Sequence, residues 1–450
     1  MILRGSPPAI GEGGRGPLRV VGEQARLSVQ PRRPPAVLSA IPHALPRAAA
    51  GVGPAPRERA AMSDSREYGV GMIGFGGIAR VHAYAHASLP FLYRPAPFST
   101  ELRGVCTSRG ETAMAAMGEG HFQFATTDAS ELIARPDIDV IHVCTPNDSH
   151  RELAIAALEA GKHVYCEKPL ADGLDGAREM LDVASSSGRT HQVTFQYRFV
   201  PAIMRAKQLV DEGLVGAPLA FRFCYLHAGY TDGQRPMSWR LDADKSGGGA
   251  LFDLGSHAID LVQHLVGDVT RVSAALPTFV HDRPVTAGSE DRAPVHVDDH
   301  AVMLMETDTG AVGTVEASRV ATGTTDDLTL EIHGTNGALK FDLMDPNWLH
   351  VYDARAGGSP IGGRRGYTKV QTVQEYPAPA ALPSPKATVG WLRFHIASLH
   401  AFMTNVHEGR VGDPSFADGA AVQAVLEAAQ TSHQTGSWAE VPEIARPFPT

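Results

Sequence analysis

The chain has 450 residues, of which 43% are hydrophobic and 7% aromatic, and its formal net charge is −9. This length is enough for two or three domains, each with its own core. The acidic balance argues against nucleic acid or an anionic membrane as the main partner, and no apolar stretch approaches the roughly 20 residues of a membrane-spanning helix. The four cysteines form no C-x-x-C pair and lie in predicted strands, so we expect small buried thiols in a reduced, cytoplasmic protein.

The first 61 residues differ in composition from the rest of the chain. They hold nine Arg, three Glu and no Lys or Asp, a net charge of +6, so the remaining residues carry −15. Their Pro and Gly content disfavours the amphipathic helix of a transit peptide, and the long apolar core of a secretory signal is missing. We expect a disordered extension, with Met62 as an ordinary place for the folded protein to begin.

Residues 68–79 carry the clearest local pattern. An apolar strand at 70–73 runs into Gly-Phe-Gly-Gly-Ile-Ala, and a helical pattern then opens. This is G-x-G-x-x-A between a strand and a helix, in which the glycines permit a tight turn and a close approach to a pyrophosphate. The free N–H groups at the helix start would face the anion. The alternative is a glycine-rich turn that binds nothing. The predicted cofactor contacts in this turn are Gly74, Gly76, Gly77 and Ile78.

Strands and helices alternate from this turn to residue 196. A loop at Pro90–Thr100 follows the first helix, and we expect it to rim the mouth of the active site. The runs Leu102–Cys106, Ile138–Cys144 and Lys162–Cys166 read as strands separated by helical patterns and short connections. This alternation predicts a doubly wound parallel sheet, a Rossmann domain over residues 62–196.

The pattern changes after Tyr197. Alternating strands follow with few helices between them, and Asn336-Gly337 is a hairpin signal between two of these strands. We expect a C-terminal domain over residues 197–450, with a largely antiparallel sheet that is open on one face. An uncovered sheet face needs a partner, so a homodimer or homotetramer is expected.

Five motifs in order make the chain resemble the glucose–fructose oxidoreductase / inositol dehydrogenase (Gfo/Idh/MocA) family over about residues 66–440. The motifs are Gly74–Ala79, Cys144-Thr145-Pro146-Asn147 with His150, Glu167-Lys168-Pro169, Gln196-Tyr197-Arg198-Phe199, and the run from Asp253 to Asp260. The resemblance implies hydride transfer between a nicotinamide cofactor and a sugar, inositol or similar polyol.

Lys168 follows a predicted parallel strand, at the edge where open α/β sheets bind ligands. A lysine there can donate to the reacting oxygen and to the nicotinamide ribose or amide, and Pro169 restricts its backbone. The resemblance places the catalytic lysine at Lys168, with Glu167 beside it as a cofactor contact. A solvated lysine at a strand end is the alternative.

The segment Gly247–His264 reads as a helix that begins after a glycine turn. Asp253 and His257 are four residues apart, so both side chains would emerge on one face. By resemblance His257 is the acid/base and Asp253 its substrate-binding partner, whereas Asp260 orients or caps. Asp253, His257, Asp260 and His264 could also ligate a metal, but hydride transfer needs none, so we predict no metal.

Cofactor preference depends on the end of the second strand. An acidic residue there would bind the ribose 2′-OH of NAD and repel the 2′-phosphate of NADP. The sequence instead has Thr107, Ser108 and Arg109, which look able to accept a phosphate. We therefore expect NADP or NAD, with a preference for NADP.

The remaining predicted contacts come from two other places in the chain. By resemblance, Thr145, Pro146, Asn147 and His150 line the nicotinamide side, although a plain strand-to-helix cap would explain them as well. The predicted substrate contacts are Tyr197, Arg198, Trp239 and Arg240, for which simple packing is the alternative.

The sequence thus predicts a cytoplasmic NAD(P)-dependent oxidoreductase that acts on a secondary hydroxyl of a sugar or polyol. Two alternatives stay open. One is a redox-neutral glycosidase that keeps its NAD bound, and the other is a non-catalytic NAD(P)-binding sensor. The sequence specifies neither the substrate nor the reaction direction.

Overall fold

The computed structural model describes residues 66–359, 361–363 and 365–447, all within one compact unit, Ala60–Thr450. The expectations about residues 1–61 lie outside the described residues. No helix in the described part is long and apolar enough to cross a bilayer.

The N-terminal part is a six-stranded parallel sheet in the order β3-β2-β1-β4-β5-β6. This is the doubly wound order, with its switch point between β1 and β4, and it confirms the predicted Rossmann sheet. The strands are β1 (Arg66–Ile73), β2 (Phe98–Cys106), β3 (Phe124–Thr126), β4 (Val140–Val143), β5 (His163–Cys166) and β6 (His191–Val193). The helices between them are α1 (Gly77–Leu92), α2 (Gly110–Gly120), α3 (Ala129–Ile133), α4 (His150–Glu159) and α5 (Leu174–Ser187).

The C-terminal part is a nine-stranded sheet in the order β16-β15-β14-β13-β7-β12-β11-β8-β17. All its pairs are antiparallel except β7 with β12, which confirms the predicted largely antiparallel sheet. Its strands are β7 (Pro218–Leu226), β8 (Val269–Ala275), β11 (His300–Thr307), β12 (Val312–Ser318), β13 (Asp327–Gly334), β14 (Gly337–Asp342), β15 (Trp348–Asp353), β16 (Thr368–Gln371) and β17 (Ala439–Glu440). The hairpin between β13 and β14 turns at Thr335-Asn336, one residue before the predicted Asn336-Gly337, because Gly337 already belongs to β14. A separate ribbon pairs β9 (Asp282–Pro284) with β10 (Arg292–Pro294).

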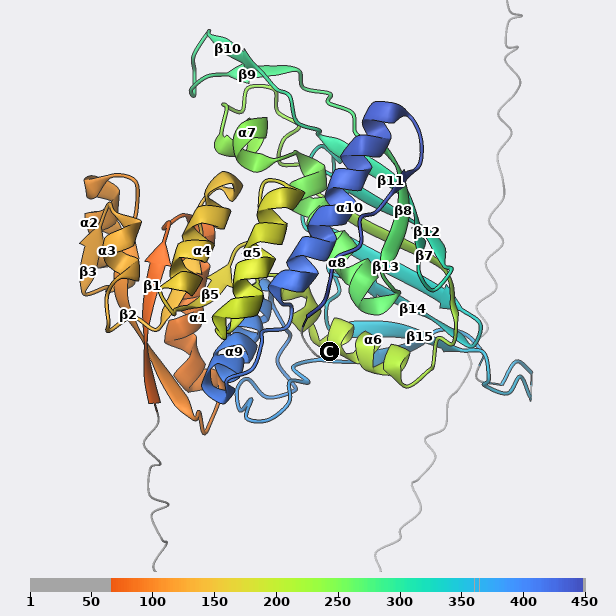
Figure 1. Cartoon of the computed structure of the whole chain (residues 1–450). Coiled ribbons are helices and arrows are strands. Elements are labelled where there is room, and N and C mark those ends of the chain that lie inside the picture. The colour runs from red at the N-terminus through yellow and green to blue at the C-terminus, as the bar shows by residue number, and fades with distance from the viewer. Residues whose placement is uncertain (1–65, 360, 364, 448–450) are drawn as a thin grey trace, which may run out of the picture. The chain divides into compact units, whose positions relative to one another are not determined.

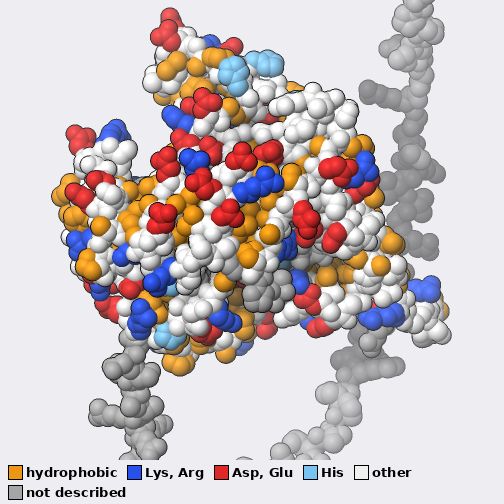
Figure 2. Space-filling view, in the orientation of Figure 1, with side chains coloured by type: hydrophobic (Ala, Val, Ile, Leu, Met, Phe, Trp, Pro, Cys, Tyr) orange, Lys and Arg blue, Asp and Glu red, His pale blue; other side chains and the backbone are white. Residues whose placement is uncertain are grey.

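Helices lie on one face of this second sheet, as Figure 1 shows for α6 (Pro201–Asp211), α8 (Ser256–Leu265) and α10 (Phe416–Thr435). On the face seen in Figure 2, acidic and basic side chains are interspersed over these helices. The C-terminal helices return to the first sheet: α9 (Trp391–Glu408) packs on α1, and α10 packs on α5 as well as on β8. The two sheets are thereby joined by segments far apart in the sequence.

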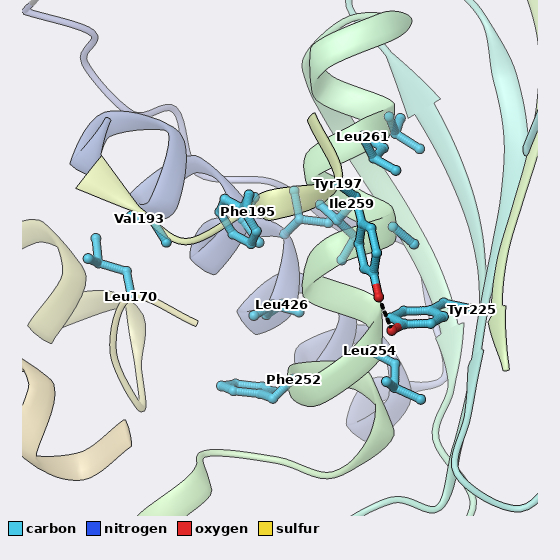
Figure 3. Packing of buried hydrophobic residues seen from close by; sticks show 14 of the residues in the cluster. Leu170, Val193, Phe195, Tyr197, Tyr225, Phe252, Leu254, Ile259, Leu261 and Leu426 are labelled. Atoms are coloured by element: carbon cyan, nitrogen blue, oxygen red, sulfur yellow. Dashed lines mark hydrogen bonds between the residues drawn. The ribbon is translucent and has the colours of Figure 1, made fainter. Parts of the chain in front are cut away.

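The main hydrophobic core is continuous from one sheet to the other. Figure 3 shows part of this core, which includes Phe195, Tyr197, Leu254 and Ile259. The Tyr197 and Tyr225 hydroxyls, both buried in this core, lie 2.6 Å apart and share a hydrogen bond. Because one core serves both sheets, their facing edges are held at a fixed separation.

Two expectations about local structure are wrong. The segment Gly247–His264 is not one α-helix, because a π-helical turn, Leu251–Gly255, precedes α8. The loop between α1 and β2 does not rim the active site, because β2 begins at the amino edge of the sheet. Tyr93 in that loop is buried against α9, where it stacks on His400 with ring centroids 3.5 Å apart.

Arg198 is also not a substrate contact. Its guanidinium is buried and donates to Asp260, with a shortest distance of 2.6 Å, and to Asp413 and Asp418. It therefore ties the start of α6 to α8 and α10, which explains Asp260 as an orienting residue. Because Asp260 binds Arg198, it is not available to the alternative metal site with Asp253, His257 and His264.

This ion-pair group gives a matched test of stability. Asp260 is 1% exposed and Asp413 is 78% exposed, although both pair with Arg198. We expect Asp260→Asn to lower the free energy of unfolding by about 3 kcal/mol, because it leaves a buried cation undercompensated. Asp413→Asn should cost less than about 1 kcal/mol, as exposed pairs do. Urea unfolding of both variants measures this, and equal losses would contradict it.

Candidate active site

A cavity of about 1120 Å³ opens at the carboxyl ends of β1, β2, β4 and β5 and extends to the second sheet. Side chains from both sheets line it. This is the edge at which doubly wound sheets bind ligands.

The glycine turn forms one end of the cavity. Gly74 has a φ of 85°, and a Cβ there would lie 2.5 Å from the Cys144 carbonyl oxygen, so only glycine fits. Cβ atoms at Gly76 and Gly77 would meet nothing within 4 Å, which leaves open space at the start of α1. Ile78 also lines the cavity, and no side chain caps α1. The turn therefore fits the pyrophosphate of a dinucleotide.

The ends of β2 and β4 form the adjoining wall. Thr107, Ser108 and Arg109 line the cavity after β2, and Ser108 and Arg109 are exposed to it. Among the described residues that directly follow β2, none with a carboxylate lines the cavity. The segment after β4 contributes Thr145, Pro146 and Asn147. The Asn147 side chain donates to the Ser246 carbonyl at 2.9 Å, which ties this wall to the segment before the π-helical turn.

His150 does not face the cavity, contrary to the expectation. It is fully buried, and its ring nitrogens lie 3.1 Å and 3.0 Å from the carbonyl oxygens of Pro169 and Thr145. A neutral ring can donate to only one of these carbonyls, and both nitrogens face protein oxygens and not the cavity.

Lys168 points across the cavity to the π-helical turn. Its Nζ donates to the Asp253 backbone carbonyl at 2.7 Å and to Asp253 Oδ1 at 3.1 Å. Arg319 donates to the other oxygen, Oδ2, at 3.1 Å. Burial by itself would raise the pKa of the Asp253 carboxyl, but the positive charges of Lys168, Arg319 and Arg240 hold it well below its usual range. Asp253 is therefore a carboxylate that fixes the lysine.

His257 lies on the next turn and lines the same cavity. Its side chain is almost fully buried against the edges of Phe195, Tyr197 and Tyr225, with ring centroids 5.0 to 6.0 Å away. Burial and the charge of Lys168 lower the pKa of His257 well below its ordinary value. Its Nδ1 is itself buried and has no hydrogen-bond partner among the described residues, and the ring lies beside the cavity as a neutral imidazole. The Asp253 carboxylate pairs with Lys168 and Arg319 and not, as expected, with His257.

The substrate end of the cavity contains residues that the sequence reading missed. Asp326 Oδ1 accepts a hydrogen bond from the Tyr225 hydroxyl at 2.7 Å and lies 3.0 Å from His227 Nε2. These side chains come from the ends of β7 and β13, and no local motif marks them. The missed lining residues are Tyr225, His227, Arg319, Asp326, Trp391 and His395.

Three of the four predicted substrate contacts do line this end. Trp239 and Arg240 face the cavity, with the guanidinium 4.4 Å from the indole ring, and Tyr197 closes the wall behind His257. Lys168, His257 and these residues therefore surround one space that also reaches the glycine turn.

Comparison with known proteins places this site in a family. Residues 68–195 match the model of an oxidoreductase family with an NAD-binding Rossmann fold, and residues 203–340 match the GFO/IDH/MocA C-terminal domain. The chain is 37% identical over 388 residues to a levoglucosan dehydrogenase of Pseudarthrobacter phenanthrenivorans, covering 84% of this chain and 98% of that protein.

Solved structures and a more distant relative agree. A levoglucosan dehydrogenase in complex with NADH and levoglucosan is similar with a TM-score of 0.80 at 36% identity, over 84% of this chain and all of that one. A scyllo-inositol 2-dehydrogenase (NAD(+)) of Bacillus subtilis is 32% identical over 52% of this chain and 64% of its own length. The chain therefore belongs to the GFO/IDH/MocA family of NAD-binding oxidoreductases.

Proposed function

We propose that the protein is an NAD-dependent dehydrogenase that oxidises a secondary hydroxyl of a pyranose-like sugar or a cyclic polyol. The observation that carries the proposal is that Lys168, its partner Asp253 and a neutral His257 line the same cavity as the glycine turn. The relatives named as levoglucosan and inositol dehydrogenases support the substrate class.

Each of the three residues has a distinct part in the reaction. The Lys168 ammonium donates to the reacting oxygen and stabilises the negative charge that develops on it. Asp253 holds the ammonium in position in the cavity. His257 takes the hydroxyl proton, as a neutral imidazole beside the cavity can. The nicotinamide, when bound, accepts the hydride from the same carbon.

The polar residues at the substrate end suit a ligand with several hydroxyl groups. The Asp326 carboxylate accepts hydrogen bonds, whereas Arg240 and Arg319 donate them. Trp239 and Trp391 offer apolar ring faces of the kind on which sugars stack. With Tyr197, these residues form the proposed binding surface for the sugar.

We infer NAD as the cofactor, although the end of β2 alone favours NADP. NADH is named in complexes of the levoglucosan dehydrogenase, and the N-terminal family is described as NAD-binding. Thr107, Ser108 and Arg109 would then surround the adenosine ribose, and Glu167 with Asn147 would lie at the nicotinamide end. The proposed domains are residues 62–196 for the cofactor and 197–450 for substrate and assembly.

The proposed assembly uses the uncovered face of the second sheet. Leu219, Val302, Leu304 and Val312 are 40–56% exposed, and they lie on three adjacent strands, β7, β12 and β11. Such a patch favours a homodimer or homotetramer. The four free cysteines are in keeping with a cytoplasmic location.

Replacement of Lys168 tests the catalytic assignment. We expect Lys168→Met to reduce turnover of a sugar by roughly 10²-fold or more, because a charged donor to the reacting oxygen is lost. Cofactor binding, followed by nicotinamide fluorescence, should persist. Lys207→Met is the control, because its ammonium pairs with an exposed carboxylate on the surface.

Full activity of Lys168→Met would contradict the assignment. A panel of sugars and cyclitols with wild-type protein tests the reaction class at the same time. Turnover without net NADH would indicate redox-neutral chemistry, for which a 2,7-anhydro-N-acetylneuraminate hydratase of Escherichia coli, 28% identical over 54% of this chain, is a precedent by name. Cofactor binding with no turnover of any compound would indicate a sensor.

The cofactor assignment is tested by kcat/KM with NAD⁺ and NADP⁺. We expect NAD⁺ to be used better by the wild-type protein. Arg109→Ala should lower residual NADP⁺ activity by about tenfold and leave NAD⁺ activity nearly unchanged, because a charged hydrogen bond to a phosphate contributes about 1.5–3 kcal/mol. Arg94→Ala, at the opposite edge of the sheet, is the control. A wild-type preference for NADP⁺ would overturn the inference.

The assembly is tested by light scattering after size exclusion. Wild-type protein should elute as a dimer or tetramer, and Leu304→Lys with Val302→Lys should shift it towards monomer because two charges enter the apolar patch. Met344→Lys changes a residue that is 59% exposed outside the patch and should not shift the mass. A monomeric wild-type protein at micromolar concentration would refute the proposed interface.

A further inference from the structure

Three carboxylates line the active-site cavity among the described residues, and their oxygens differ in what they bind. Both oxygens of Asp253 accept from cations, Oδ1 from Lys168 and Oδ2 from Arg319. Glu167 Oε2 accepts from the Lys168 backbone N–H, and its Oε1 is buried. The third carboxylate, Asp326, is the one that keeps an oxygen open to the cavity.

The protein donors around Asp326 converge on a single oxygen. Oδ1 lies 2.7 Å from the Tyr225 hydroxyl, 3.0 Å from His227 Nε2 and 3.5 Å from the Tyr197 hydroxyl. Oδ2 has no hydrogen-bond partner among the described residues, and it is not a buried atom. The Asp326 side chain is 37% exposed and lines the cavity, so Oδ2 is within reach of a ligand there.

Protonation states fix the direction of these hydrogen bonds. Burial raises the pKa of both Tyr197 and Tyr225, so both remain phenols that can donate. Burial alone would raise the pKa of Asp326 as well, but hydrogen bonds with His227 and Tyr225, and the charge of His227, hold it below its usual value. An ionised carboxylate accepts hydrogen bonds and cannot donate them. A ligand group at Oδ2 must therefore carry a hydrogen to donate.

Asp326 lies close to the residues proposed to carry the reaction. Tyr225 spans the gap, because its ring is 5.7 Å from the His257 ring by centroid and its hydroxyl binds Asp326. One phenol side chain thus separates the proposed proton acceptor from the open carboxylate. A pyranose or cyclitol ring with its hydroxyl groups is of similar size. One such molecule can place one hydroxyl at His257 and another at Asp326.

We propose that Asp326 determines specificity by accepting, at Oδ2, a hydrogen bond from a second hydroxyl of the substrate, one that is not oxidised. This rests on the proposed dehydrogenase function and narrows its substrate class to sugars and cyclitols that present a free hydroxyl at this second position. An ether oxygen or a bare C–H there displaces water and leaves the carboxylate without a donor. Such compounds are poor substrates even when the reacting hydroxyl is intact.

A purely structural role is the rival explanation, because Asp326 also holds Tyr225 and His227 in place. Asp326→Asn separates the two roles. The two donors at Oδ1 require an acceptor, so the amide oxygen takes that position and the NH₂ group takes the position of Oδ2. The variant therefore keeps the hydrogen bonds within the protein and turns the open acceptor into a donor.

Levoglucosan and its three monodeoxy derivatives test the proposal through kcat/KM. Two of these derivatives keep the reacting hydroxyl. With wild-type protein, one of the two should lose about 10- to 100-fold in kcat/KM, as loss of a hydrogen bond to a charged group does. Asp326→Asn should lower kcat/KM by about tenfold for levoglucosan and by much less for that derivative, because the derivative lacks the hydroxyl that the carboxylate binds.

Asp327→Asn is the matched control, because Asp327 is the next residue in the chain and does not line the cavity. It should discriminate among the derivatives as the wild-type protein does. The proposal is wrong if neither derivative with the reacting hydroxyl loses tenfold with wild-type protein, a result that depends on no variant. It is also wrong if folded Asp326→Asn lowers kcat/KM equally for levoglucosan and the derivative, as a structural role would, or leaves both unchanged.

Calorimetry with the NADH-bound protein makes the same comparison without turnover. We expect the Kd of levoglucosan to rise about tenfold in Asp326→Asn, and the Kd of the deoxy derivative to change much less. This pattern in a protein that oxidises no sugar would refute only the proposed function. Oxidation of levoglucosan with the same Kd in both proteins would overturn the role of Asp326 and leave the proposed function standing. Absence of levoglucosan binding to the wild-type protein would overturn the role of Asp326 as well.

Discussion

The ion pair between Lys168 and Asp253 is the constraint on which the site depends. It joins the carboxyl edge of the parallel sheet to the π-helical turn before α8, and Arg319, directly after β12, holds the second carboxylate oxygen. A buried carboxylate with only one cation is costly, whereas two cations and good geometry offset its desolvation. The lysine is therefore held in one position before any ligand arrives. Preorganisation of this kind is what an electrostatic donor to a reacting oxygen requires.

The backbone around Asp253 is held as firmly as its side chain. The Asp298 carboxylate accepts from the N–H groups of Gly249 and Leu251, both at 2.7 Å. A Cβ at Gly249 would collide with the Asp298 carbonyl, so a glycine is needed at this close approach. The π-helical turn that follows rotates Asp253 towards Lys168 and leaves His257 facing the cavity. Local backbone geometry thus decides which of two neighbouring side chains meets the cations.

The buried histidines of this protein differ in the groups that surround them. His257 lies beside the cavity and near Lys168, where a neutral ring suits direct proton transfer. His82, His86 and His142 are buried among one another, where each nitrogen has a neighbour and the single nearby charge is Glu167. Both ring nitrogens of His150 face backbone carbonyl oxygens. Burial lowers the pKa of four of these rings, His86, His142, His150 and His257, and the neighbours of each ring decide what it can do.

The sequence by itself determined the features that are encoded locally. The strand–turn–helix at Gly74, the alternation that gives a parallel sheet, and the positions of Lys168 and His257 at a strand end and on a helix all follow from short-range patterns. The tertiary structure decided the rest, because the partners are distant in the chain: Arg198 is bound to Asp260 and Asp418, and His150 to the loop of Pro169. Arg319, Asp326 and the residues of α9 reach the cavity only when the second sheet and the last helices pack against the first sheet. No spacing along the chain could reveal them, since packing, and not periodicity, brings them together.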